Sequence, residues 1–127
     1  MNFSVDIVSI PVSDQDRARA FYTEILGFSL REDADMGGGR RWVELVPPAG
    51  GASITLVTWF PDMPAGSLHG LVLGTDDAHA AFAELQARGV EFAEAGVQDA
   101  PWGQHATFCD PDGNSWVLVG PVAESAE

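Results

Sequence analysis

The chain of 127 residues carries a faint internal duplication, in which the second half repeats the first at an offset of about 63 residues. The matched positions keep the same order along both halves and fall at turns, helix starts and helix ends. They are Ser13-Asp14 with Asp76-Asp77, Ala18 with Ala81, Gly27 with Gly89, Gly51 with Gly113, and Ser53-x-x-Leu56-Val57 with Ser115-x-x-Leu118-Val119. The repeat predicts two copies of one supersecondary unit.

Each half has the pattern of a strand, a helix and three further strands. β-branched runs indicate the strands, helical spacing of apolar residues indicates the helices, and glycine marks each helix end. In the first half the strands are expected at 7–12, 28–32, 41–46 and 53–59, and a helix capped by Ser13 or Asp14 ends at Gly27. In the second half the strands are expected at 68–75, 90–93, 104–108 and 115–119, and a helix capped by Asp76 or Asp77 ends at Gly89.

The organisation predicted from these elements is an α+β fold of two βαβββ modules. Residues 1–121 form a single domain with modules at about 4–60 and 68–121, a linker at 61–67 and a frayed tail at 122–127. One helix covers only one face of a four-stranded sheet, so the other face stays uncovered. Two such sheets are expected to curl around a shared cleft, which is where a binding site would lie.

The charge balance excludes several classes of function. Nineteen acidic residues oppose six basic ones, which are all arginine, and the net charge is −13. Nucleic acid and anionic membrane surfaces are therefore poor partners, and lysine-dependent chemistry is excluded. The acidic surplus either attracts a cationic ligand or only keeps the protein soluble. Cys109 is the sole cysteine, so no internal disulfide forms, and without a signal-peptide pattern we expect a cytoplasmic location.

Several motifs then carry a family resemblance. They are Ser13-Asp14, Ala20-Phe21-Tyr22, Leu26-Gly27-Phe28, Thr75-Asp76-Asp77, Ala87-Arg88-Gly89-Val90, Pro101-Trp102-Gly103 and Asp110-Pro111-Asp112-Gly113-Asn114. In this order they resemble the vicinal oxygen chelate superfamily, which comprises glyoxalases, bleomycin-resistance proteins and extradiol dioxygenases. The resemblance spans essentially the whole chain and implies the paired βαβββ fold.

The resemblance also implies where a divalent metal would be bound in this family. The four ligand positions fall on Ile7, Thr55, Gly70 and Val117. Divalent metals prefer imidazole or carboxylate ligands, and none of these side chains supplies one. His69 neighbours Gly70, but strand alternation is expected to turn it away from the cleft. We therefore expect neither a metal nor another cofactor.

Strand alternation from the same positions predicts which side chains line the cleft. The expected ligand-binding residues are Ile7, Ser9, Trp42, Glu44, Thr55, Val57, Trp59, Gly70, Val72, Trp102, His105 and Val117. The alternate residues are expected to pack under the helices: Val43, Leu45, Ile54, Leu56, Trp116 and Leu118. The predicted surface is aliphatic, with aromatic walls and one carboxylate.

Several of these residues have a second interpretation. Trp42 and Trp59 suit either pocket walls or anchors of a dimer interface. Trp102 lies either at the cleft mouth or over the core. Glu44 is either a polar anchor for a cationic group or, in the favoured interpretation, a solvated strand residue. No catalytic residue is assigned.

The sequence therefore predicts a metal-free protein that sequesters a small aromatic or cationic organic ligand and forms a homodimer. The alternative is a metal-dependent lyase, isomerase or dioxygenase of the same superfamily, which requires metal ligands that the sequence does not show. A third hypothesis is an accessory domain whose cleft contacts a partner protein.

Overall fold

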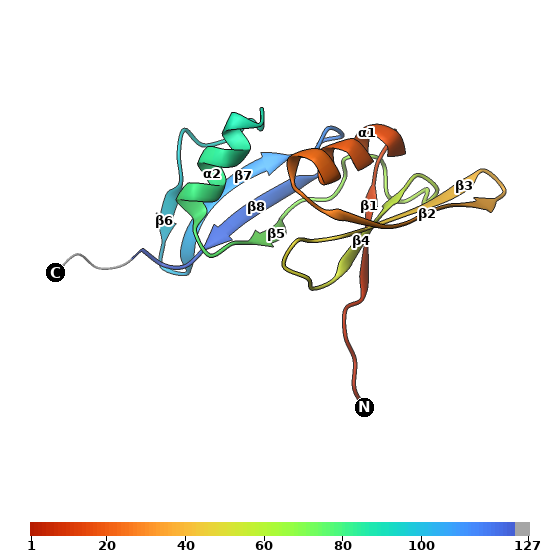
Figure 1. Cartoon of the computed structure of the whole chain (residues 1–127), viewed down its shortest axis with the longest axis horizontal. Helices are drawn as coiled ribbons and strands as arrows, with labels where there is room; N and C mark the ends of the chain where they lie inside the picture. Colours follow the sequence, from red (N-terminus) through yellow and green to blue (C-terminus); the bar gives the residue numbers. More distant parts are fainter. Residues whose placement is uncertain (124–127) are drawn as a thin grey trace. The chain divides into compact units, whose positions relative to one another are not determined.

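The computed structural model describes residues 1–123, and the chain divides into two compact units. The first unit comprises Met1–Leu68 together with the turn Pro111–Asn114. The second unit comprises His69–Asp110 and the residues from Ser115 onward. Each unit contains one four-stranded sheet and one main helix (Figure 1). The part of the predicted tail at 124–127 lies outside the described residues.

The first unit has the predicted βαβββ order. Its elements are β1 (Ile7–Pro11), α1 (Gln15–Ala20), a π-helical turn η1 (Phe21–Ile25), β2 (Ser29–Gly37), β3 (Arg40–Val46) and β4 (Ser53–Val57). The strands lie in the order β1-β4-β3-β2, with β1 parallel to β4 and the other pairs antiparallel (Figure 1). The two ends of the repeat, β1 and β4, are therefore neighbours in the sheet.

The second unit repeats this topology. Its elements are β5 (Leu71–Gly74), α2 (Ala78–Ala87), β6 (Gln98–Ala100), β7 (Gly103–Cys109) and β8 (Ser115–Gly120). The order is β5-β8-β7-β6, with β5 parallel to β8, and α2 packs against β7 and β8 (Figure 1). Phe82 and Leu85 of α2 are buried, as are Trp116 and Leu118 of β8. The predicted core position of Trp116 is confirmed.

Helix caps explain where both helices begin. The Asp14 carboxylate accepts a hydrogen bond from the backbone N–H of Arg17, and the Asp77 carboxylate accepts one from Ala80 at 3.0 Å. In each half the second of the two candidate residues is therefore the cap. Gly27 follows η1 with φ +77°, a conformation that side chains with a Cβ seldom adopt.

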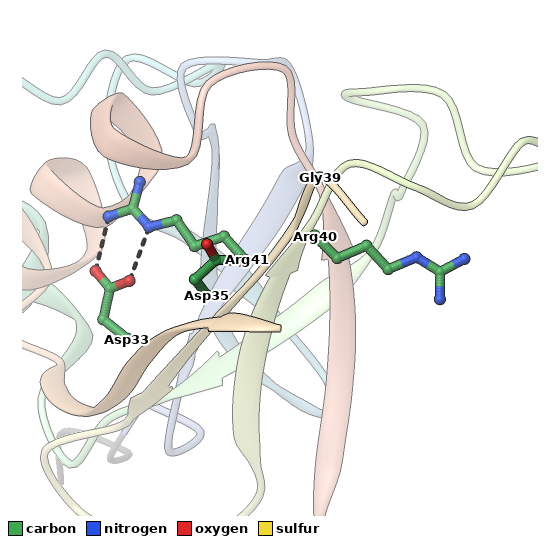
Figure 2. A pocket seen from close by; sticks show the side chains of 5 residues that line it. All are labelled: Asp33, Asp35, Gly39, Arg40 and Arg41. Atoms are coloured by element: carbon green, nitrogen blue, oxygen red, sulfur yellow. Dashed lines mark hydrogen bonds and ion pairs between the residues drawn. The ribbon is translucent and has the colours of Figure 1, made fainter. Parts of the chain in front are cut away.

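One face of the first sheet packs against α1. Its buried strand residues are Val43, Leu45, Ile54 and Leu56, as alternation predicted. On the same face, the Asp33 carboxylate of β2 accepts hydrogen bonds from Arg41 of β3 at 2.7 Å (Figure 2). It also accepts a hydrogen bond from Arg19 of α1. The hydrogen bonds from Arg41 hold the pKa of Asp33 below its ordinary value, although burial opposes them. This contribution to stability is therefore complete at neutral pH and is lost only as the pH falls through the lowered pKa.

Several element boundaries differ from the predictions. β2 continues to Gly37, because it pairs with β3 along a longer hairpin. β4 ends at Val57, so Trp59 lies beyond the strand. β5 begins only at Leu71, because Gly70 has φ +76°, which interrupts an extended strand. No helix among residues 1–123 is long and apolar enough to cross a membrane.

The second strand of the second half is also displaced. The predicted strand at 90–93 is reduced to one bridge between Phe92 and Phe108, and the Phe92 ring packs between those of Phe82 and Phe108. The strand that pairs with β7 is instead β6, at Gln98–Ala100. The apolar residues at 90–93 therefore serve the core beneath α2 rather than a regular strand.

The turn Pro111–Asn114 is fixed to the first unit by side-chain hydrogen bonds. The Asp112 carboxylate accepts from the backbone N–H and the hydroxyl of Ser13, at 3.1 and 2.5 Å, and from Arg17 at 3.1 Å. The buried Asn114 amide donates to the Pro11 carbonyl at 2.8 Å and accepts from the Leu68 N–H at 3.1 Å. A short segment from the second half of the sequence thus completes the packing of the first unit.

Candidate ligand-binding site

The first unit has a sheet face that α1 does not cover. Because Val43 and Leu45 face α1, the alternate residues of the same strands lie on the opposite face. The pairing register aligns Ser9 of β1 with Thr55 of β4, and Thr55 with Glu44 of β3. These three polar residues therefore form a row across the middle of the face, which we call the polar row.

Glu44 is the buried carboxylate of this row. It is only 6% exposed, so the interpretation of a solvated strand residue is wrong. Its Oε1 accepts a hydrogen bond from the Trp42 indole N–H at 3.1 Å, and its Oε2 lies 3.6 Å from Nε of Arg31. A register shift in β2 between Leu30 and Glu32 frees Arg31 from regular pairing. The carboxylate is thus oriented by an aromatic neighbour and partly neutralised by a cation.

Thr55 lies at the centre of the polar row and is 1% exposed. Among residues 1–123, its hydroxyl oxygen meets no hydrogen-bond partner. Burying a hydroxyl without a partner is unfavourable, and buried polar groups in proteins are nearly always paired. The Thr55 hydroxyl can therefore still donate and accept a hydrogen bond. It belongs to the residue paired with Glu44 on the neighbouring strand.

Aromatic side chains flank the row on the first unit. Trp42 is half-buried and lies two residues before Glu44 on β3, so the two side chains share a strand face. Trp59 is half-buried, packs 6.0 Å from Phe60 and has the Arg40 guanidinium 5.9 Å from its ring centroid. Figure 2 shows Arg40 extending away from the side on which Arg41 meets Asp33. The β3 strand thus separates the Arg40–Trp59 contact from the ion pairs of the helix side.

A shallow depression at the β2–β3 hairpin is a poor candidate site. It has a volume of about 370 Å³ and is lined by Asp33, Asp35, Gly39, Arg40 and Arg41 (Figure 2). The Asp33 and Arg41 charges are already paired with each other, and the Asp35 carboxylate accepts from the Gly37 N–H at 2.8 Å. None of the predicted ligand-binding residues lines it.

The second unit carries the remaining predicted residues. On its sheet, Val72 of β5 pairs with Val117 of β8, and Val117 pairs with Thr107 of β7. Val72 is exposed and Val117 half-buried. Trp102 is 60% exposed, which excludes the interpretation of a cap over the core, and its ring stacks on that of His105 at 4.8 Å.

Two positions next to β5 do not fit the strand-alternation argument. Gly70 precedes the strand, so it does not share a strand face with Val72. The same is true of His69, and the prediction that alternation turns it away therefore has no basis. The Nδ1 atom of His69 lies 3.3 Å from the hydroxyl of Ser115. Ser115 is two residues before Val117 on β8, so the two share a strand face.

Sequence reasoning missed one carboxylate beside this sheet. Glu94 accepts hydrogen bonds from the backbone N–H and hydroxyl of Thr107, at 2.7 and 3.1 Å. Glu94 lies in an irregular segment between the Phe92 bridge and β6. No periodicity in that segment indicates which face its side chain takes, so the sequence offers no signal for it.

The residues at the family's metal-ligand positions do not fit a divalent ion. Ile7, Gly70 and Val117 have no donor atom, and Thr55 offers only a neutral hydroxyl. Within the described part of the chain, no group of three or more His, Cys, Asp or Glu side chains is placed to hold a metal ion.

Comparison with known proteins decides the family. The family model described as the Glyoxalase/Bleomycin resistance protein/Dioxygenase superfamily matches residues 4–118. The chain belongs to this superfamily. The resemblance and the fold predicted from the sequence are confirmed.

Three relatives of this superfamily member cover most of the chain. The crystal structure of TnmS3, an antibiotic binding protein from Streptomyces sp. CB03234, is 48% identical, covers 95% of this chain and 98% of that chain, and has a TM-score of 0.87. The crystal structure of a superfamily member from Sphaerobacter thermophilus DSM 20745 is 34% identical and has a TM-score of 0.85. The match covers 94% of this chain and 98% of that chain. The YetH protein of Bacillus subtilis (strain 168) is 32% identical over 117 residues, which are 90% of this chain and 95% of YetH.

Proposed function

We propose that this superfamily member is a metal-free binding protein that sequesters a small aromatic or cationic organic molecule. The observation that carries the proposal is the Trp42–Glu44 pair on the face of the first sheet opposite α1. An indole ring gives a flat apolar contact, and its N–H orients a buried carboxylate that recognises polar groups of a ligand. The antibiotic-binding relative TnmS3 supports a small-molecule ligand.

The predicted site residues have distinct roles in this proposal. Trp42 and Trp59 supply aromatic contacts, Ile7 and Val57 apolar ones, and the polar row supplies hydrogen bonds. For the second unit, Val72, Val117, Trp102 and His105 remain predicted ligand contacts, and the rings of Trp102 and His105 stack on each other. Gly70 remains a predicted contact through its backbone. Sequestration requires only binding, which agrees with a site to which no nucleophile or base is assigned.

Tryptophan fluorescence tests the proposal directly. We expect a panel of aromatic antibiotics, cationic and neutral, to include compounds that quench the intrinsic fluorescence saturably. Trp42→Ala should weaken the affinity by about 1–3 kcal/mol, because it removes an aromatic contact and releases Glu44. Val122→Ala, at an exposed position after β8, is the control and should leave the affinity unchanged.

The same titration distinguishes the metal-dependent alternative. Binding that is unchanged after treatment with a chelator agrees with a metal-free site. Binding that disappears with the chelator and returns with zinc or manganese would favour the lyase, isomerase or dioxygenase hypothesis. A panel without any saturable quenching would contradict the proposal as a whole.

We further propose that the protein forms a homodimer. The segment before β1 exposes Phe3 and Val5 at alternate positions, and β1 is itself an edge strand of the first sheet. Exposed apolar side chains beside an unpaired strand edge favour association. We expect sedimentation at micromolar concentration to give twice the chain mass of 13.5 kDa.

Substitution of the same segment checks which surface associates. The Phe3→Ser/Val5→Ser double variant should shift the distribution toward monomer. Met36→Ser, at an exposed apolar residue of the β2–β3 hairpin, should not. A wild-type protein that sediments only at 13.5 kDa would count against the dimer.

A further inference from the structure

The strongest unexplained feature of the molecule is the buried, unpartnered hydroxyl of Thr55. The two neighbours of Thr55 across the sheet are polar, since Ser9 pairs with it on one side and Glu44 on the other. Neither accepts from or donates to the Thr55 hydroxyl. In an apolar site a valine would fill the same volume without the cost of desolvating a hydroxyl. The unused hydrogen-bonding capacity therefore needs an explanation.

We infer that the polar row recognises a hydroxyl group on a neutral aromatic ligand, with Thr55 and Glu44 as its two partners. This inference rests on the proposed function and narrows its ligand class. A ligand hydroxyl donates to the Glu44 carboxylate, which only accepts, and accepts from the Thr55 hydroxyl, which does both. One group of the ligand thereby satisfies both side chains.

The charges around Glu44 favour a neutral hydroxyl over a cation. Arg31 lies 3.6 Å from the outer carboxylate oxygen and partly neutralises it. A ligand ammonium would compete with this arginine and be repelled by it, whereas a hydroxyl meets no such repulsion. The Arg31 side chain is 66% exposed and holds Glu44 by this one contact, so it can yield to a ligand entering beside the carboxylate.

Trp42 sets the position of the ring that carries the hydroxyl. The indole N–H donates to Oε1 of Glu44 at 3.1 Å and so holds the ring beside the carboxylate. An aromatic ligand in contact with the indole therefore has its substituents close to Glu44. A ligand that contacts the Trp42 ring and bonds to both Thr55 and Glu44 must carry a hydroxyl on its aromatic ring, as a phenol does.

The substitution Thr55→Val removes only the hydroxyl, and its first readout requires no ligand. The variant should unfold at the same temperature as the wild type or a higher one, because an unpaired buried hydroxyl is lost. Thr107→Val is the matched comparison, because its hydroxyl donates to Glu94, and this variant should unfold at a lower temperature. A drop for Thr55→Val as large as that for Thr107→Val would show that the Thr55 hydroxyl has a partner, and would overturn the inference.

The second readout is affinity for 2-naphthol and for naphthalene, measured by tryptophan quenching. The wild-type protein should bind 2-naphthol more tightly than naphthalene. Thr55→Val should weaken 2-naphthol by about tenfold, the loss of one hydrogen bond, and leave naphthalene unchanged or tighter. Thr55→Ser keeps the hydroxyl and should restore the preference. Thr58→Val, at an exposed position beyond β4, is the control and should keep the preference for 2-naphthol over naphthalene.

The outcomes separate this inference from the proposed function. If both probes bind equally to wild type and to Thr55→Val, small-molecule binding stands and the hydroxyl-recognition inference is wrong. If 2-naphthylmethylammonium binds more tightly than 2-naphthol and depends on Glu44, the row selects a cation and the inference is again wrong. If neither the probes nor the antibiotic panel quench the fluorescence, the proposed function and the inference fail together.

Discussion

Replacement of Gly66 by alanine is expected to destabilise the protein by about 2–5 kcal/mol. Gly66 has φ +80°, which costs a residue with a Cβ about 1–2 kcal/mol. A Cβ there would also lie 2.0 Å from the backbone oxygen of Asp112. Backbone on both sides of the contact must then shift, which adds about 1–3 kcal/mol. The free energy of unfolding, measured by urea denaturation, reports the sum.

The matched control is Gly50→Ala. Gly50 has φ +87°, but a Cβ there would meet nothing within 4 Å. This variant should therefore lose only the conformational part, about 1–2 kcal/mol. The difference between the two variants measures how tightly the turn Pro111–Asn114 packs on the first unit. Equal losses for both would mean that the turn moves aside without cost.

Asn114→Ala is expected to cost about 3 kcal/mol. The side chain is fully buried, and its loss leaves the Leu68 N–H without this acceptor. The Pro11 carbonyl loses one of its two donors and keeps the Gly66 N–H at 3.1 Å. Each buried polar group left unsatisfied costs about 1–3 kcal/mol. Denaturation with urea again gives the measurement, and Asn2→Ala at an exposed position is the control.

Asn114→Asp refines this test. An aspartate at this position still accepts a hydrogen bond from the Leu68 N–H. A carboxylate oxygen, however, replaces the NH₂ group that donates to the Pro11 carbonyl. Its stability at neutral pH should therefore resemble that of the alanine variant, and it should improve as acid protonates the carboxylate. A loss below about 1 kcal/mol in both variants would contradict the role given to these hydrogen bonds.

The parts of the fold that could be predicted are those with a local physical signal. Asp14 and Asp77 precede apolar helical patterns, and both cap their helices through side-chain hydrogen bonds. Alternation along β3 and β4 placed Leu45 and Leu56 beneath α1, since successive strand residues face opposite sides. Trp42 and Glu44 were assigned to the other face by the same argument.

The parts that could not be predicted depend on contacts between distant segments. β6 has three residues and exists because it pairs with β7, so its own sequence carries little signal. Glu44 lies 3.6 Å from Arg31, a residue at the register shift of β2, and no local pattern indicates this contact. The unpaired state of the Thr55 hydroxyl depends on every neighbour at once. Strand parity gives the face of a residue, but not its partners.

The turn Pro111–Asn114 also bears on how the chain is synthesised. The side-chain amide of Asn114 joins the Leu68 N–H to the Pro11 carbonyl. When Leu68 leaves the ribosome, Asn114 has not yet been translated. The first module can collapse earlier, but its final hydrogen bonds await the turn just before the last strand of the second module. A gene cut at the boundary of the repeat would therefore yield a first half that lacks its own closing turn.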